Sequence, residues 1–271
     1  MASHIVRPPA VAGSFYPADA GVLSAQVHDL LVRAPHPVPP ATPKALLVPH
    51  AGYVYSGAVA ASAYALLEPL RDTIRRVVLL GPSHRVPLNG MALPGCNRMA
   101  TPLGEMEVDA EGVFSLARLP GVVVDDRPHA AEHALEVQLP FLQTVLDHAS
   151  VLPISVGQAA PEQVAAVLEA VWGGPETLVL VSSDLSHYHA YADARQRDHA
   201  TIERVLSLSP TLRPEDACGA MPLNGFFHAA RKHGLRPQLL DLRNSGDTAG
   251  DRSRVVGYAS VAFSAEAQVL H

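Results

Sequence analysis

Two histidines stand where an apolar run of the chain meets a turn. His50 follows the run Ala45–Val48, and His84 follows Val77–Leu80 in the turn Gly81-Pro82-Ser83-His84. If the two runs are adjacent parallel strands, both imidazoles lie at one edge of a sheet, where α/β proteins bind ligands. Neutral imidazoles that meet there are a starting point for a transition-metal site. The alternative is that each is a packing or surface residue.

A carboxylate and another histidine follow a third apolar run. Leu178–Val181 leads into Ser182-Ser183-Asp184-Leu185-Ser186-His187. If this segment begins a helix, Asp184 and His187 share a face, and Asp184 either orients the imidazole or caps the helix. Because imidazoles exchange protons near neutral pH, His187 is a candidate for proton transfer.

Cysteine is scarce in this chain. Cys218 offers a thiolate ligand or, alternatively, a small buried hydrophobe, whereas Cys96 has no obvious partner. Two cysteines make no disulfide framework, the first residues lack the apolar core of a secretory signal, and no run of 18 apolar residues occurs. We therefore expect a cytoplasmic protein with no membrane segment.

The segment His129-Ala130-Ala131-Glu132-His133 matches the pattern H-x-x-E-H. In zinc peptidases with this pattern, two histidines one turn apart hold zinc and the glutamate acts as base. Such a site needs a third ligand, for which Glu203 is a candidate. The alternative is the polar start of an amphipathic helix over residues 131–148. The zinc peptidase stays open as one functional hypothesis.

The elements that would position these residues alternate in type. Continuous apolar runs followed by helical patterns are typical of a mostly parallel sheet covered on both faces. The tail holds two runs without a helix between them, residues 238–242 and 255–263, which indicate antiparallel edge strands. We predict a single α/β domain over residues 1–271, with a mostly parallel central sheet and helices on both faces. Strands are expected over 45–48, 77–80, 151–154 and 178–181, helices over 23–32, 57–67, 131–148, 161–172, 192–208 and 222–233, and an extended connector over 35–43.

Composition removes several classes of function. The 20 Lys and Arg against 26 Asp and Glu leave no basic surplus, so nucleic-acid binding is not expected. Hydrophobic residues make up 48% of the chain, too many for a disordered protein. The glycine-rich and nucleophile motifs of nucleotide-binding proteins and serine hydrolases are absent. The 14 histidines direct attention to metal.

Several motifs together resemble one known family. The opening Arg7-Pro8-Pro9-Ala10-Val11-Ala12-Gly13-Ser14-Phe15-Tyr16-Pro17 resembles the start of the Memo family, whose microbial members are called AmmeMemoRadiSam system protein B. The resemblance runs from about residue 7 to 263. Its further motifs are, in order, Pro49-His50-Ala51-Gly52-Tyr53-Val54-Tyr55-Ser56-Gly57, Gly81-Pro82-Ser83-His84, Glu132-His133-Ala134-Leu135-Glu136 before Leu139-Pro140-Phe141, Ser182-Ser183-Asp184 with His187, and Cys218-Gly219 before Pro222.

The resemblance implies a fold similar to that of class III extradiol dioxygenases, which hold non-haem iron(II) with two histidines and a carboxylate. It implies that His50 and His84 are metal ligands and that Cys218 replaces the carboxylate. His187 would be the acid–base residue, with Asp184 beside it. The residues that would line or support the pocket are His133, Glu136, Tyr53 and Ser83.

A thiolate ligand changes the expected metal. It is softer than a carboxylate and favours copper(I) or zinc while still allowing iron. We therefore expect iron(II) or copper, with zinc as an alternative, in a metal-dependent, dioxygenase-like oxidoreductase whose small-molecule or peptide substrate is unassigned. The alternative within the family is a non-catalytic binding or accessory protein that keeps the pocket. The microbial name implies radical-SAM and AMMECR-type partner proteins.

Overall fold

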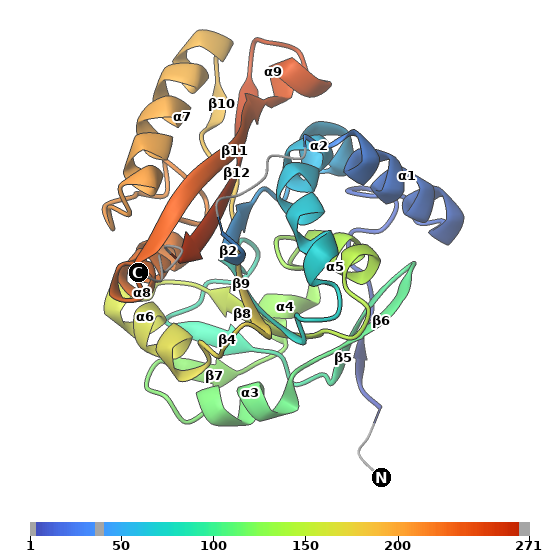
Figure 1. Cartoon of the computed structure of the whole chain (residues 1–271), viewed down its shortest axis with the longest axis vertical. Coiled ribbons are helices and arrows are strands. Elements are labelled where there is room, and N and C mark those ends of the chain that lie inside the picture. The colour runs from blue at the N-terminus through green and yellow to red at the C-terminus, as the bar shows by residue number, and fades with distance from the viewer. Residues whose placement is uncertain (1–3, 36–40, 266–271) are drawn as a thin grey trace, which may run out of the picture.

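The computed structural model describes residues 4–35 and 41–265 and is built around one large sheet (Figure 1). Its strand order is β10-β12-β2-β9-β3-β8-β4-β7, and β11, which lies off this path, pairs with β12. The pairs β2–β9, β9–β3 and β3–β8 are parallel. The strands are β2 (Pro43–Val48), β3 (Arg76–Pro82), β4 (Met91–Leu93), β7 (Val122–Val124), β8 (Ser150–Val156), β9 (Thr177–Ser182), β10 (His187–His189), β11 (Leu235–Asn244) and β12 (Val255–Ala265).

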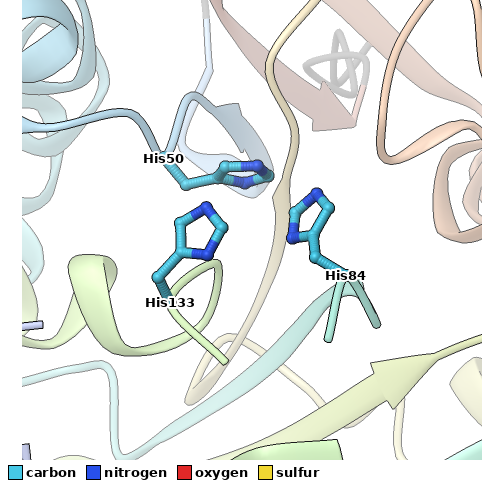
Figure 2. A group of neighbouring side chains, drawn as sticks. All are labelled: His50, His84 and His133. Atoms are coloured by element: carbon cyan, nitrogen blue, oxygen red, sulfur yellow. The ribbon is translucent and has the colours of Figure 1, made fainter. Parts of the chain in front are cut away.

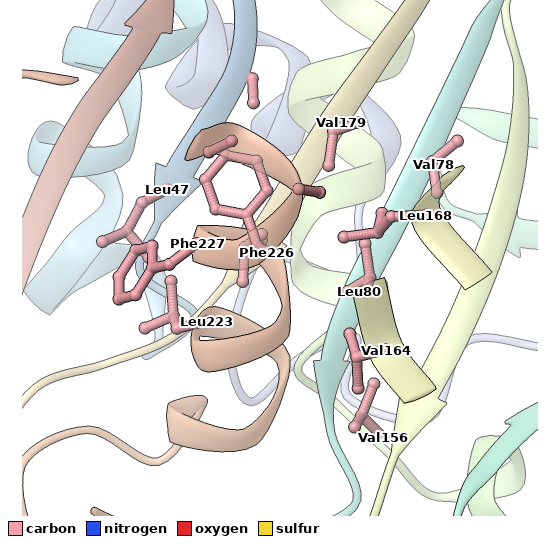
Figure 3. Packing of buried hydrophobic residues seen from close by; sticks show 14 of the residues in the cluster. Leu47, Val78, Leu80, Val156, Val164, Leu168, Val179, Leu223, Phe226 and Phe227 are labelled. Carbon is pink, nitrogen blue, oxygen red and sulfur yellow. The ribbon is translucent and has the colours of Figure 1, made fainter. Parts of the chain in front are cut away.

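Helices cover both faces of this sheet. On one face, alternate strand residues such as Leu47 and Val179 pack against α6 (Pro161–Ala170) and α8 (Ala220–Lys232), as Figure 3 shows. On the other face, Leu46 and Leu180 pack against α1 (Ala20–Arg33), α2 (Tyr53–Tyr64) and α5 (Leu139–Val145). A strand that is buried on both faces needs apolar residues at every position, which explains the continuous apolar runs. The predicted α/β fold, with a largely parallel centre and helices on both faces, is confirmed.

Shorter elements complete the described part of the chain. A separate small sheet joins β1 (Val6–Arg7), β5 (Arg98–Thr101) and β6 (Gly104–Glu107) in that order. The tail strands β11 and β12 are antiparallel, as expected. The remaining helices are η1 (Ala65–Leu70), α3 (Ala110–Leu116), α4 (Arg127–Ala130), η2 (Glu136–Gln138), α7 (Tyr191–Leu206) and α9 (Ser245–Thr248). Most of the predicted connector, residues 36–40, lies outside the described residues.

Two expectations are wrong, one about which strands are neighbours and one about the length of a helix. The strands β2 and β3 are not adjacent, because β9 pairs with both of them. The helix expected over residues 131–148 is also shorter, since regular structure runs only through η2 and α5. Its polar start is not helical because the Glu132 carboxylate accepts hydrogen bonds from the backbone N–H groups of His133 and Ala134. A side chain that binds nearby backbone donors in this way competes with the helix.

Candidate metal centre

Three imidazoles meet beyond the carboxyl ends of the parallel strands. His50 follows β2, His84 follows β3, and His133 lies in the turn between α4 and η2. One nitrogen from each ring lies within 4.8 Å of the corresponding atoms of the other two. Figure 2 shows the three rings turned toward one another, with ring centroids 4.8 to 5.3 Å apart. The group is open on one side, since the His50 side chain is buried while that of His84 is 28% exposed.

The chain after β9 holds His50 in place. The Asp184 carboxylate accepts a hydrogen bond of 2.8 Å from the His50 backbone N–H. The Ser182 hydroxyl lies 2.8 Å from His50 Nδ1, donates to the Ala134 carbonyl and accepts from the Gln138 side-chain amide. Because a hydroxyl has one proton to donate, Ser182 accepts from His50 Nδ1. This arrangement puts the proton on Nδ1, so His50 Nε2 carries a lone pair, which accepts from the Cys218 thiol at 3.2 Å.

The Glu132 carboxylate holds His84 in place in a similar way. Its carboxylate accepts from the His84 backbone N–H at 2.6 Å and lies 2.9 Å from His84 Nδ1. Burial by itself raises the pKa of Glu132, but contacts with the His133 and His84 rings and backbone N–H groups hold that pKa well below its usual range. An ionised carboxylate only accepts hydrogen bonds, so Nδ1 of His84 carries the proton. Its Nε2 then carries a lone pair as well.

The electrostatics of the group suit a bound cation. Burial lowers the pKa of His50 well below its usual value, and the neighbouring His84 and His133 lower it further. Neutral imidazoles are the form that binds metals, and a ligand histidine commonly donates its second N–H to a carboxylate or another oxygen. His133 Nδ1 is buried without a hydrogen bond, although it lies 3.2 Å from Glu132. The donor set fits a transition-metal ion.

Cys218 lies next to this group. Its Sγ is 3.2 Å from His50 Nε2, and the Asp184 backbone N–H donates to it at 3.3 Å. Desolvation, and then the charge of Asp184, raises the pKa of the thiol, so the free thiol keeps its proton. Among the described residues, the group whose possible ligand atoms all lie close to one another consists of His50, His84 and His133. Cys218 is not part of that group but contacts it at His50.

Asp184 and His187 face a cavity beside the imidazoles. This cavity of about 460 Å³ is also lined by His133, Phe15 and Tyr55. The segment that joins Asp184 to His187 is not the start of a helix, because His187 lies in β10 and the residues between have no regular secondary structure. Its backbone instead pairs with Gly257 of β12. Burial raises the pKa of Asp184.

The other residues predicted for the pocket make hydrogen bonds or ion pairs within the protein near the imidazoles. Glu136 is fully buried and pairs with Arg7. The Tyr53 hydroxyl donates to the Val137 carbonyl at 2.7 Å, and the Ser83 hydroxyl donates to the Val86 carbonyl at 2.7 Å. These bonds shape the turns that carry the imidazoles rather than the surface of the cavity.

The zinc-peptidase pattern does not assemble into a ligand set. His129 is buried with Nε2 3.0 Å from the Ala92 carbonyl, and burial lowers its pKa to about 4. Glu203, the suggested third ligand, is exposed on α7. His133 instead joins His50 and His84, a place that strand positions alone could not reveal because it follows no strand. In the sequence, His133 was marked by the H-x-x-E-H pattern that it shares with Glu132, and by the family motif that implied a place at the pocket.

The fold and the site together define an α/β protein with a cluster of three histidines at the carboxyl edge of its parallel strands. The profile of Memo-like proteins matches residues 7–262, and the chain belongs to the Memo family.

Relatives of this family match over nearly their whole length. A MEMO1 family protein of Sulfolobus acidocaldarius is 36% identical over 283 residues, which cover 96% of this chain and 99% of that protein. A MEMO1 family protein of Aquifex aeolicus is 36% identical over 274 residues, which cover 95% and 99%.

One solved structure has a weaker likeness. It is that of an uncharacterized protein from Escherichia coli K12, with a TM-score of 0.45, 12% identity, and coverage of 80% of this chain and 98% of that one. None of the helices within residues 4–35 and 41–265 has both the length and the apolar character needed to cross a bilayer.

Proposed function

We propose that His50, His84 and His133 bind a transition-metal ion. The observation that supports this most directly is the fixed protonation of two of the rings, since Ser182 and Glu132 hold Nδ1 of His50 and His84. Both Nε2 atoms then carry a lone pair, and a metal ion at His50 would replace the hydrogen bond that Nε2 accepts from the Cys218 thiol at 3.2 Å. Iron, copper and zinc all bind imidazole, and Cys218 at 3.2 Å from His50 Nε2 could add a soft thiolate that favours copper(I) or zinc.

We further propose that the protein is a metal-dependent oxidoreductase that uses iron(II) or copper. A bound ion of either metal would supply electron transfer at the edge of the cavity. His187, on the cavity wall with Asp184, would move protons to and from the substrate. The volume of about 460 Å³ suits a small molecule, whose identity is unassigned. A cytoplasmic location and radical-SAM and AMMECR-type partners remain part of this proposal.

Metal analysis tests the site. Purified protein is loaded anaerobically with iron(II), copper(I) or zinc, and the bound metal is measured by mass spectrometry. His84→Ala should weaken binding at least about 100-fold, because it removes one of the three imidazole ligands, whose side chain is partly exposed. His148→Ala, an exposed histidine far along the chain, is the matched control. Full metal content in both His84→Ala and His133→Ala would overturn the assignment.

Two further variants separate the roles within the site. His187→Gln should keep its metal but lose oxygen consumption with catechols or other reducing substrates, if His187 transfers protons. Cys218→Ser should keep an imidazole-bound metal with an altered preference for copper(I). Tight metal binding with no oxygen uptake on any substrate would favour the non-catalytic binding or accessory protein.

A further inference from the structure

Arg7, in β1, is a buried arginine next to the metal centre. It is 7% exposed, although it lies only three residues after the first described residue. Its Nε and Nη2 donate to the His129 carbonyl at 3.1 and 2.9 Å, and Nη2 also donates to the Glu132 carbonyl at 2.7 Å. Its Nη1 forms an ion pair with Glu136. One guanidinium therefore binds three points of the segment from residue 129 to 136.

Glu136 ties the rest of the N-terminal segment to the same place. Its carboxylate accepts from the backbone N–H groups of Ala10 at 2.8 Å and Val11 at 3.0 Å, and from the Tyr16 hydroxyl. Burial, and then the bond to Glu136, raises the pKa of Tyr16, so the hydroxyl keeps the proton it donates. Every one of these donors belongs to residues 7–16.

The segment between these anchor points carries the third imidazole. His133 lies between the Glu132 carbonyl and Glu136, in a turn with no helical hydrogen-bond ladder of its own. The Phe15 ring packs against the His133 ring with centroids 4.6 Å apart. The Phe15 carbonyl in turn accepts from the backbone N–H of Tyr53, where α2 begins.

We propose that Arg7 is a positioning residue for the metal centre: it fixes the turn that presents His133 and Glu132 to His50 and His84. This inference rests on the proposed metal site. A planar guanidinium with five donors in a fixed fork can bind two carbonyls and a carboxylate at once, which a lysine ammonium cannot do in the same geometry. Supporting groups of this kind typically change metal affinity by 10- to 100-fold.

The test compares two arginines. Arg7→Met and Arg7→Lys are set against Arg76→Met, which removes an arginine ion-paired with Asp109 at 2.7 Å on β3, the strand that precedes His84. Cobalt(II) is the probe, because its visible spectrum reports coordination number. Arg7→Met should bind cobalt(II) about 10- to 100-fold more weakly with a changed spectrum. Arg7→Lys should be intermediate, and Arg76→Met should keep the wild-type affinity and spectrum even if it is less stable.

A measurement on metal-free protein separates this inference from the metal site itself. The imidazole ¹⁵N resonances of His133 should shift in Arg7→Lys and stay unchanged in Arg76→Met. If wild-type protein binds no cobalt(II) but these resonances shift, the metal site fails and the positioning of His133 stands. Unchanged resonances together with wild-type cobalt(II) binding in Arg7→Lys and Arg7→Met would overturn the role of Arg7.

Discussion

The two ends of strands β2, β9 and β3 both hold polar side chains, but those side chains have different partners. At the amino end, Lys44 Nζ donates to the carbonyl oxygens of Trp172, Gly174 and Thr177 at 2.6 to 2.8 Å. On the next strand but one, Arg76 pairs with Asp109. Both of these cations therefore have oxygen partners within the protein.

At the carboxyl end, three imidazole rings face one another. His50, His84 and His133 present nitrogen atoms to one another, and the two neighbours help to lower the pKa of His50. Glu132 is the acid of this group, since its carboxylate lies 2.9 Å from His84 Nδ1 and 3.2 Å from His133 Nδ1. The amino end pairs these cations with oxygen atoms of the protein, whereas the carboxyl end gathers three imidazoles around one carboxylate, an arrangement that suits the proposed metal ion.

The largest difference between the ends should appear in Glu132→Gln. A neutral amide can no longer accept from both the ring and the backbone of His84, so metal affinity should fall by 10- to 100-fold. The measurement is a competition titration against a chelator. Glu169→Gln, at a carboxylate that pairs with Lys232 and His233 near the amino end, is the control and should bind metal normally. Equal affinities in the two variants would remove the contrast between the ends.

The next effect is a dependence of stability on pH at the carboxyl end. The pKa of His129 is about 4 in the folded protein against 6.5 for an unperturbed histidine, because burial disfavours the charged ring. The unfolded chain thus binds more protons between these values, so folding stability falls as the pH falls. From about pH 7.5 to about pH 5, His129 should account for about 2 kcal/mol of the lost free energy of unfolding.

Urea unfolding of chelator-treated protein at both pH values measures this loss. His129→Gln keeps a polar side chain that can donate to the Ala92 carbonyl but has no proton to bind in this range. The variant should therefore lose about 2 kcal/mol less than the wild type on acidification. The same loss in both proteins would show that His129 is not the group responsible.

A smaller effect is expected at the amino end. Lys44→Met removes the donor shared by three carbonyl oxygens and should lower the free energy of unfolding by about 1–2 kcal/mol. Metal affinity should not change, because Lys44 lies near the start of β2 and His50 follows the opposite end of that strand. Denaturant unfolding and the chelator competition provide the two readouts. A weakened metal site in Lys44→Met would show that the two ends are coupled.

The smallest effect should come from an exposed ion pair at the amino end. The Lys232 side chain is 67% exposed where it meets Glu169. Exposed pairs of this kind contribute at most about 1 kcal/mol, and Lys232→Ala should lie within that limit in thermal or urea unfolding. A loss as large as that of Lys44→Met would mean that surface charge, rather than buried donors, stabilises this end.

The apolar runs made the central strands predictable, because burial on both faces imposes a pattern that needs no tertiary information. The same pattern placed His50 and His84 at strand ends. Strand order was not predictable, since several parallel arrangements bury the same runs, and β9 proved to lie between β2 and β3. That position is what brings Ser182 and Asp184 against His50.

The central place of His133 was harder to predict. Its turn lies outside the strand pattern, and its apparent helix gives way because Glu132 binds the backbone N–H groups that a helix would use. The bonds that settle this turn come from Arg7, more than 120 residues earlier in the chain. No local pattern encodes a contact of that length.

The sequence by itself determined the α/β class, the family motifs and the two histidines at strand ends, because each depends on residue type and local periodicity. Only the tertiary structure decided which groups meet: His133 as the third imidazole, Ser182 and Glu132 as the partners that fix the protons of His50 and His84, and Arg7 as the support beneath them. The physical reason is that a donor set is defined by distances across the fold, and those distances follow from strand order and from buried long-range hydrogen bonds.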